Sequence, residues 1–275
     1  MRESTVKWTD FIAWAFYFPS PGVGSYYVVQ RNFFQVSYSL WTNLLLLGIE
    51  PLFYLVAFGF GLGFYLGDVM GVPYLNYFGV SLIFISGLMN TYTESTQSLA
   101  KRMKNFGSYS PYLFSPVPLR QIALGEILWG TLKGFIASVI VSVVLVAMGT
   151  VSPGLAIVAL MISFSIYWIF SAMGVLVTSS SYHKNLAIYL QSLVLLPMIL
   201  FSGTYFPIEF IPDFIEVLAI FSPITHGLGI VRSIQSDSIN YNMFISFAVI
   251  FSYLVFMTNY ATVYFERKVK SIFES

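Results

Sequence analysis

One carboxylate lies deep within an apolar part of this sequence. Glu50 is followed by Pro51 inside a hydrophobic stretch over residues 41–65. An ionisable group in the middle of a membrane span costs roughly 2.5–3.5 kcal/mol on insertion scales, so its side chain should face the bundle interior or water. Because Pro51 removes one helix hydrogen bond, we expect a kink beside it. Hydrogen bonding within the bundle is the favoured role for Glu50, and substrate contact is the alternative.

The sequence lacks the motifs of common catalytic and metal sites. It has no G-x-x-x-x-G-K-S/T phosphate loop, no H-E-x-x-H motif and no G-x-S-x-G elbow. There is no cysteine, and His183 and His226 lie too far apart in sequence to suggest a metal motif. We predict no catalytic residue and no metal site. A membrane-embedded enzyme using Glu50 and an ion-coupled secondary transporter are the less favoured alternatives, because both usually need several ionisable groups at bilayer depth.

Composition indicates an integral membrane protein. Of the 275 residues, 57% are hydrophobic and 19% aromatic, but only 9% are charged, against about 25% in soluble domains. A net charge of +1 leaves no broad basic face for nucleic acid. We expect an all-α polytopic protein in which an arm, residues 1–37, precedes one six-span domain, residues 38–275. The expected spans cover residues 41–65, 74–93, 122–148, 155–178, 186–205 and 243–263.

Polar segments flank these spans. Residues 26–36 mix apolar and polar side chains, which suits a helix lying in the membrane interface, as an anchor or for docking a partner. The loop over residues 94–120 is basic, and its opening, residues 94–106, is compatible with a helix. Its basic cluster is interpreted as a topology signal, as a lever that touches a soluble partner, or as both. Glu126 and Lys133 are seven residues apart, so we expect no direct salt bridge between them.

Orientation follows from the basic residues. Eleven of the 13 Lys and Arg residues fall in the arm, in the loops over residues 94–120 and 179–185, and in the tail. Positively charged loops stay in the cytoplasm, so both termini are predicted to be cytoplasmic.

The fifth expected span does not end cleanly. After Gly203 and Pro207, two short helical patterns follow, over residues 211–221 and 224–235. Ser222 can cap the second helix and Pro223 suits its first position. Two short, half-apolar helices after a span suggest a structure that closes over a pathway, and we interpret them as re-entrant helices forming the outer gate of an export channel.

Aromatic residues are frequent on the first and fifth spans. They include Trp41, Phe53, Tyr54 and Phe58 on the first span, and Tyr189, Phe201 and Tyr205 on the fifth. The ordinary interfacial belt explains most of them. The functional alternative is a pore whose aromatic rings slide along the faces of sugars.

The order of these features resembles the membrane subunit of ABC type-2 exporters, close to nodulation-factor and O-antigen or polysaccharide exporter permeases. The resemblance extends over nearly the whole chain. It rests on Glu50-Pro51 with Phe58-Gly-Phe-Gly-Leu-Gly63, Ser115-Pro116-Val-Pro118, Leu124-Gly125-Glu126-Ile-Leu-Trp129, Phe201-Ser-Gly-Thr-Tyr-Phe206-Pro207, Ile211-Pro212, Ser222-Pro223-Ile-Thr-His226 and Arg232.

The resemblance implies a homodimer with a central channel, driven by two separate ATPase subunits. ATP and Mg would be bound by that partner, and this chain would hold no cofactor. The coupling residues would be Arg31, Glu94, Lys101, Arg102 and Lys104. The channel would be lined by Trp41, Glu50, Phe53, Tyr54, Phe58, Tyr189, Phe201 and Tyr205. The outer gate would comprise Phe206, Pro207, Ile211, Pro212, Phe214, Ser222, Pro223, His226 and Arg232.

The expected function is therefore export of a lipid-linked oligosaccharide or polysaccharide, such as an O-antigen-like glycan, across the cytoplasmic (inner) membrane. Export of a hydrophobic drug or lipid is the alternative. The expected partners are a second copy of the chain, two ABC ATPase subunits, membrane lipid and the lipid-linked glycan.

Overall fold

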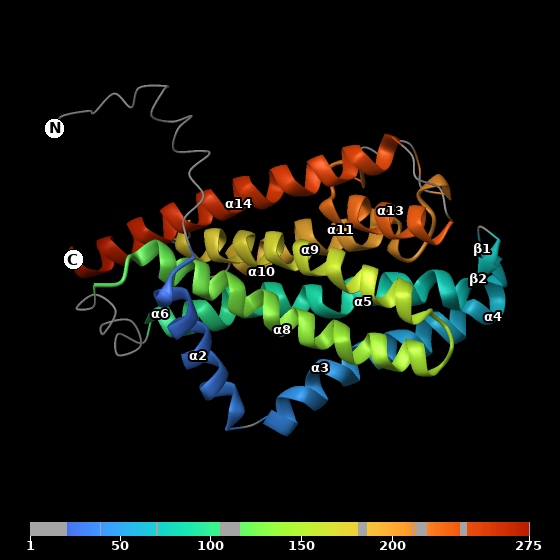
Figure 1. Cartoon of the computed structure of the whole chain (residues 1–275), viewed down its shortest axis with the longest axis horizontal. Coiled ribbons are helices and arrows are strands. Elements are labelled where there is room, and N and C mark those ends of the chain that lie inside the picture. The colour runs from blue at the N-terminus through green and yellow to red at the C-terminus, as the bar shows by residue number, and fades with distance from the viewer. Residues whose placement is uncertain are drawn as a thin grey trace.

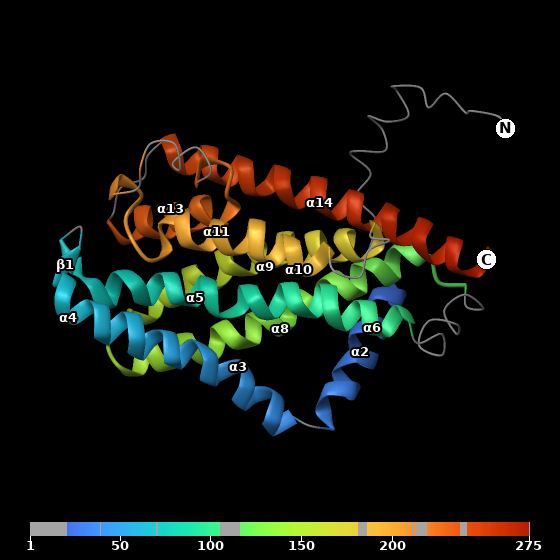
Figure 2. The same ribbon diagram turned by 180° about the vertical axis from the view of Figure 1, so that it is seen from behind.

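The computed structural model describes residues 21–38, 40–69, 71–104, 116–180, 186–210, 212, 219–236 and 241–274. These residues form a helical bundle whose long helices run lengthwise beside one another (Figures 1 and 2). The long helices are α3 (Leu40–Tyr54), α5 (Tyr74–Thr93), α8 (Leu119–Ala147), α9 (Pro153–Ser180) and α14 (Tyr241–Glu274). Within the described ranges the strands are β1 (Asp68–Val69) and β2 (Val72–Pro73), which pair antiparallel.

Shorter helices lie at the two ends of the bundle. At the end where α14 finishes are α2 (Val23–Ser37), η2 (Glu94–Ser98) and α6 (Leu99–Lys104), and α13 (Pro223–Gln235) lies towards the opposite end (Figure 1). The fifth expected span is divided into α10 (Leu186–Leu190), η3 (Gln191–Leu195), α11 (Leu196–Ile199) and η4 (Leu200–Thr204), followed by η5 (Ile208–Phe210).

Five helical stretches of the described chain are long and apolar enough to cross a membrane: Trp41–Leu66, Leu119–Ala147, Pro153–Ser180, Leu186–Thr204 and Asn242–Ser271. The predicted second span has the same bounds as α5 but is not among these five. Most of α5 is buried inside the bundle, and it carries serines whose hydroxyls bond to other helices. An all-α polytopic membrane protein is thus confirmed, whereas the number of six spans stays a prediction.

The first and fifth spans contain wider helical turns. In the first, the segment η1 (Leu55–Leu62) is π-helical and begins four residues after Pro51, before the short helix α4 (Gly63–Leu66). In the fifth, the π-helical segments η3 and η4 flank Pro197. A proline lacks the N–H that an i→i+4 ladder needs, and π-helical turns are frequent where that ladder is disturbed and at functional sites.

The core lies where α5, α8 and α9 cross. A Cβ added to Gly87 would come within 2.3 Å of the Gly134 carbonyl oxygen, so the backbones of α5 and α8 touch there and both positions require glycine. Beside this contact, the fully buried hydroxyl of Tyr167 donates to the carbonyls of Ile83 at 2.6 Å and Phe84 at 3.0 Å. Small residues and internal hydrogen bonds therefore hold the bundle together where water is excluded.

Candidate coupling network and channel-lining pocket

Two buried carboxylates share one arginine near the α2 end of the bundle. Glu94 and Glu126 are 4% and 1% exposed. Arg102 Nη1 lies 2.6 Å from Glu94 Oε1, and its Nη2 lies 2.7 Å from Glu126 Oε2. Since α6 follows η2 directly, Arg102 clamps the end of this helical segment onto α8.

Helix α2 joins this cluster through Glu126. Arg31 Nη2 lies 2.7 Å from Glu126 Oε1, and the Asn32 amide donates to Glu126 Oε2 at 3.1 Å. The helix is anchored a second time where Ser25 Oγ donates to the Gln121 carbonyl at 2.8 Å. The interface-helix segment predicted over residues 26–36 thus lies within α2 and is bonded to α8.

On the other side of the cluster, Lys133 Nζ donates to Glu94 Oε2 at 2.8 Å and Trp129 Nε1 donates to Glu94 Oε1 at 3.0 Å. Glu94 lies just beyond the predicted second span. Burial alone would raise the pKa of its carboxyl, but Arg102 and Lys133 outweigh burial and lower that pKa to about 2. We call Arg31, Glu94, Arg102, Glu126 and Lys133 the charge network.

The predicted coupling residues divide into two groups. Arg31, Glu94 and Arg102 meet in the charge network, whereas Lys101 and Lys104 are exposed on α6. Glu126 was not among the predicted coupling residues, although it contacts two of them. The seven-residue spacing predicted no direct salt bridge between Glu126 and Lys133, and the ion pair of Lys133 is with Glu94, which was not predicted. Sequence spacing along α8 could not reveal the ion-pair partners of Glu126, because both arginines that contact it belong to other helices.

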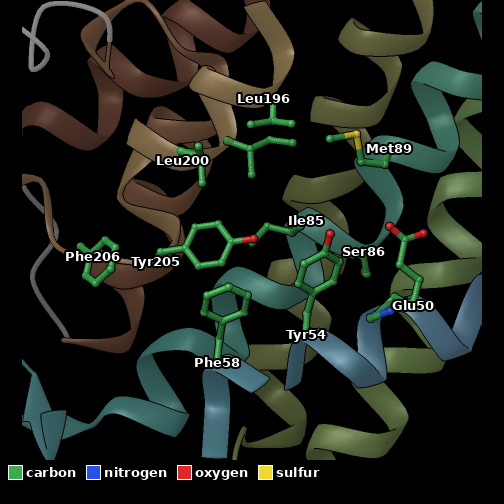
Figure 3. Close-up of a pocket in the computed structure, with 12 residues that line it drawn as sticks. Glu50, Tyr54, Phe58, Ile85, Ser86, Met89, Leu196, Leu200, Tyr205 and Phe206 are labelled. Atoms are coloured by element: carbon green, nitrogen blue, oxygen red, sulfur yellow. The ribbon is translucent and has the colours of Figure 1, made fainter. Parts of the chain in front are cut away.

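An aromatic pocket lies between the first span, α5 and the fifth span (Figure 3). It has a volume of about 270 Å³. Phe58 packs edge-on against Tyr205, with ring centroids 4.9 Å apart, and stacks on Tyr54 at 6.1 Å. The aromatic pocket is lined by Glu50, Pro51, Tyr54, Phe58, Ile85, Ser86, Met89, Leu196, Ile199, Leu200, Tyr205 and Phe206.

Half of the predicted channel-lining residues line this pocket, namely Glu50, Tyr54, Phe58 and Tyr205. The other four, Trp41, Phe53, Tyr189 and Phe201, do not line it. The side chains of Trp41, Phe53 and Tyr189 are 82%, 70% and 59% exposed. The aromatic content of a span could not separate the two groups. Packing against α5 determines which face of each span is turned towards the pocket. In the pocket, Glu50 and Tyr54 approach the polar Ser86 from α5 (Figure 3).

The break after the fifth span is held by a buried arginine. Gly203 has φ +79°, a left-handed backbone conformation that favours glycine. Its carbonyl accepts bonds from Tyr77 Oη at 2.6 Å and from Arg232 Nη2 at 2.7 Å. The same Arg232 nitrogen donates to Ser81 Oγ at 3.0 Å, and the guanidinium lies 4.1 Å from the Tyr77 ring centroid. Of these residues, sequence reasoning singled out only Arg232 and the Gly203 turn.

The second gate helix begins where it was predicted to begin but lacks its predicted cap. Helix α13 begins at Pro223, as predicted, but Ser222 makes no side-chain capping bond, because its hydroxyl lies 2.7 Å from Ser202 Oγ instead. His226 Nδ1 lies 3.0 Å from Ser246 Oγ and its Nε2 lies 2.9 Å from the Ile220 carbonyl oxygen.

The remaining gate residues lie just after the fifth span. Phe206 lines the aromatic pocket, Pro207 is buried and Pro212 is exposed. Ile211 and Phe214, with most of the predicted helix over residues 211–221, lie outside the described residues. Among the residues that are described, no three His, Asp or Glu side chains gather in a way that could hold a metal ion.

Comparisons with known proteins agree with this architecture. The model of the ABC-2 type transporter family matches residues 25–236. Nodulation protein J of Sinorhizobium fredii is 28% identical over 188 residues, 68% of this chain and 72% of that protein. Nodulation protein J of Rhizobium leguminosarum bv. trifolii is 28% identical over 76% of this chain and 79% of that protein, and that of R. leguminosarum bv. viciae is 24% identical over 86% and 92%.

No solved structure matches the chain. The family match covers the segments that carry the charge network, the aromatic pocket and the Arg232 contacts. The chain therefore belongs to the ABC-2 type transporter family, as the membrane subunit of an ABC exporter whose ATP hydrolysis takes place in a separate partner subunit.

Proposed function

We propose that this chain exports a lipid-linked oligosaccharide or polysaccharide, such as an O-antigen-like glycan, across the cytoplasmic membrane. The observation that carries the proposal is the aromatic pocket between the first and fifth spans. The rings of Tyr54, Phe58 and Tyr205 line this pocket together with one carboxylate, that of Glu50. Aromatic faces with a few polar groups suit sugar rings, which are apolar on their faces and polar at their edges. The resemblance of the sequence motifs to those of nodulation-factor and polysaccharide exporter permeases supports a cargo of this kind.

Two copies would complete the pathway. The outer face of the first span carries exposed apolar side chains spaced about one helical turn apart, namely Trp41, Leu45, Ile49, Phe53, Val56, Phe60 and Phe64. Lipid or a second copy of the chain would cover this stripe. We propose a homodimer in which the aromatic pockets of the two copies face a shared channel, with both termini in the cytoplasm.

Coupling to the ATPase would run through the charge network. An ATPase subunit would contact the exposed face of α6, where Lys101 and Lys104 lie. Since Arg102 on the same helix is bonded to both buried carboxylates, a push on α6 would be transmitted to α8 and α2. The Arg232 contacts at the other end would hold the outer gate closed until the bundle moves.

The test is transport by the chain reconstituted with its ATPase. Tyr205→Ala and Phe58→Leu should reduce glycan transport per ATP hydrolysed. Phe53→Leu serves as the matched control, because Phe53 lies on the same span, does not line the pocket and is 70% exposed. Equal transport by the pocket variants and the control would contradict the proposal.

A second cargo is favoured by the rest of the lining. Ile85, Leu196, Ile199 and Leu200 give the pocket an apolar wall that suits a hydrophobic drug or lipid. Stimulation of the ATPase distinguishes the two: glycan-dependent stimulation supports the first proposal, and stimulation by hydrophobic compounds alone supports the second.

A further inference from the structure

A second cavity lies beside the charge network. It has a volume of about 330 Å³ and is formed by α2, the start of α3, η2, α6 and α8. Its lining is polar, unlike that of the aromatic pocket, and includes Gln35, Asn43, Ser98, Lys101 and Lys133. We call it the basic cavity. Asn43 stands two residues after the start of the first predicted span, which brings the basic cavity close to the level of lipid headgroups.

The charges around this cavity are unequal. Lys101, Arg102 and Lys133 line it together with one carboxylate, Glu94. The pair behind them, Arg31 with Glu126, adds one charge of each sign. Both oxygens of Glu94 already accept hydrogen bonds, from Arg102 and Trp129 on one side and Lys133 on the other. The cavity therefore presents an excess of positive charge.

The cavity also offers donors to a ligand. An ammonium group has three N–H donors, and the structure shows one hydrogen bond for Lys133, to Glu94. Within the described part of the chain, Lys101 makes no ion pair. Ser98 contributes a hydroxyl, and Gln35 contributes an amide. These hydrogen-bond donors all line one polar cavity that carries excess positive charge. Such an arrangement suits the binding of phosphate oxygens.

We propose that the basic cavity binds the phosphate group of an anionic lipid. Two sources share this chemistry: the headgroup of a membrane phospholipid, and the phosphate that joins a glycan to its lipid carrier. This inference rests on the proposed function, because that function places this end of the bundle on the cytoplasmic side. Because the basic cavity lies between α2 and α6, a bound phosphate would touch α6, which we propose to contact the ATPase, and α2, to which a push on α6 would be transmitted.

Lys101→Gln is the variant that tests the site. Lys101 is exposed on α6, so its loss should leave the fold intact. Lys104→Gln is the matched control, because Lys104 is an exposed lysine of the same helix that does not line the cavity. The probe is dioctanoyl phosphatidate titrated against the full chain in a neutral detergent, with binding followed by microscale thermophoresis. Dioctanoyl phosphatidylcholine, whose headgroup has no net charge, is the reference ligand.

We expect the chain to bind phosphatidate more tightly than phosphatidylcholine. Lys101→Gln should weaken phosphatidate binding about three- to tenfold, as expected for one lysine near an anionic surface, and Lys104→Gln should change it less than about twofold on the same reasoning. Equal affinity for the two lipids would overturn the proposal. An equal loss in both variants would also overturn it, because the lipid would then be held by a diffuse basic surface.

One further ligand, farnesyl phosphate, separates the sources of the phosphate. Farnesyl phosphate and dioctanoyl phosphatidate are both phosphate monoesters of similar charge, so tighter binding of farnesyl phosphate assigns the cavity to the cargo carrier, and the reverse order assigns it to membrane phospholipid. Neither titration requires ATPase or transport. Phosphate binding without export would contradict only the proposed function, whereas export by a chain that binds no phosphate would contradict only this inference.

Discussion

Glu126 holds two arginines while being almost completely buried. Its two oxygens lie 2.7 Å from Arg31 and 2.7 Å from Arg102. Removing one member of a buried ion pair leaves the others uncompensated, at a cost of about 3–5 kcal/mol. We expect Glu126→Ala to lower the apparent melting temperature of the detergent-purified chain strongly.

The control for this variant is Glu266→Ala. Glu266 also contacts two cations, Arg120 and Lys270, but it is partly exposed. Partly exposed ion pairs contribute only about 0–1 kcal/mol, so the control should melt close to the unmodified chain. Similar melting temperatures for the two variants would show that Glu126 does not stabilise the fold through its ion pairs.

The pKa of Glu94 gives a pH dependence with a defined sign. The pKa is lowered from 4.5 to about 2, so the ion pairs of Glu94 stabilise the fold above about pH 4.5 and are lost as the pH falls towards 2. A shift of this size corresponds to about 3 kcal/mol. The difference in melting temperature between the unmodified chain and Glu94→Gln should therefore narrow as the pH is lowered from 7 to 3. A difference in melting temperature that stays constant from pH 7 to pH 3 would show that the ion pairs of the Glu94 carboxylate do not stabilise the fold.

Three of the predicted coupling residues lie together in the structure, but the sequence did not predict which residues they contact. Arg31, Glu94 and Arg102 were selected together and do meet. They were expected to face a partner, but Glu94 and Arg102 are largely buried and bond to each other, so their substitution should affect stability as well as coupling. Glu126 was not predicted as a coupling residue and Tyr77 was not singled out, because their partners come from helices distant in sequence.

Among the elements, the broken end of the fifth span depends on Gly203. Its φ of +79° disfavours other residues, and an added Cβ would lie 3.1 Å from Ile208 and 3.2 Å from Arg232. We expect Gly203→Ala to destabilise the chain by about 1–2 kcal/mol, seen as a lower apparent melting temperature. Gly229→Ala is the control, because this helical glycine of α13 has open space around it and alanine is the better helix former. A Gly203→Ala chain as stable as the control would exclude strain at this turn.

Element positions were more predictable than their internal geometry. The predicted bounds of the second span coincide with α5, and the predicted fourth span lies within α9. Helix α14 extends beyond the sixth predicted span and continues to Glu274 through a segment whose apolar residues Phe265 and Val269 pack against the bundle. Hydropathy also cannot reveal the π-helical turns of the first and fifth spans, which depend on how the chain compensates for Pro51 and Pro197.

Three features of the molecule follow one another along the length of the bundle. The charge network lies towards the end where α14 finishes, the aromatic pocket lies between the first and fifth spans, and the Arg232 contacts fix α13 towards the other end (Figure 1). This order suits a subunit that receives a push at one end and opens at the other. The single chain leaves the outer face of its first span exposed, and the proposed second copy would cover this face.

The most direct test of the account is the native mass of the complex that the tagged chain forms in its own membrane, solubilised in mild detergent. We predict two copies of this chain with two copies of a soluble subunit that carries an ATP-binding phosphate loop. A chain that purifies alone, or in a single copy with no ATPase at any salt concentration, would contradict the account.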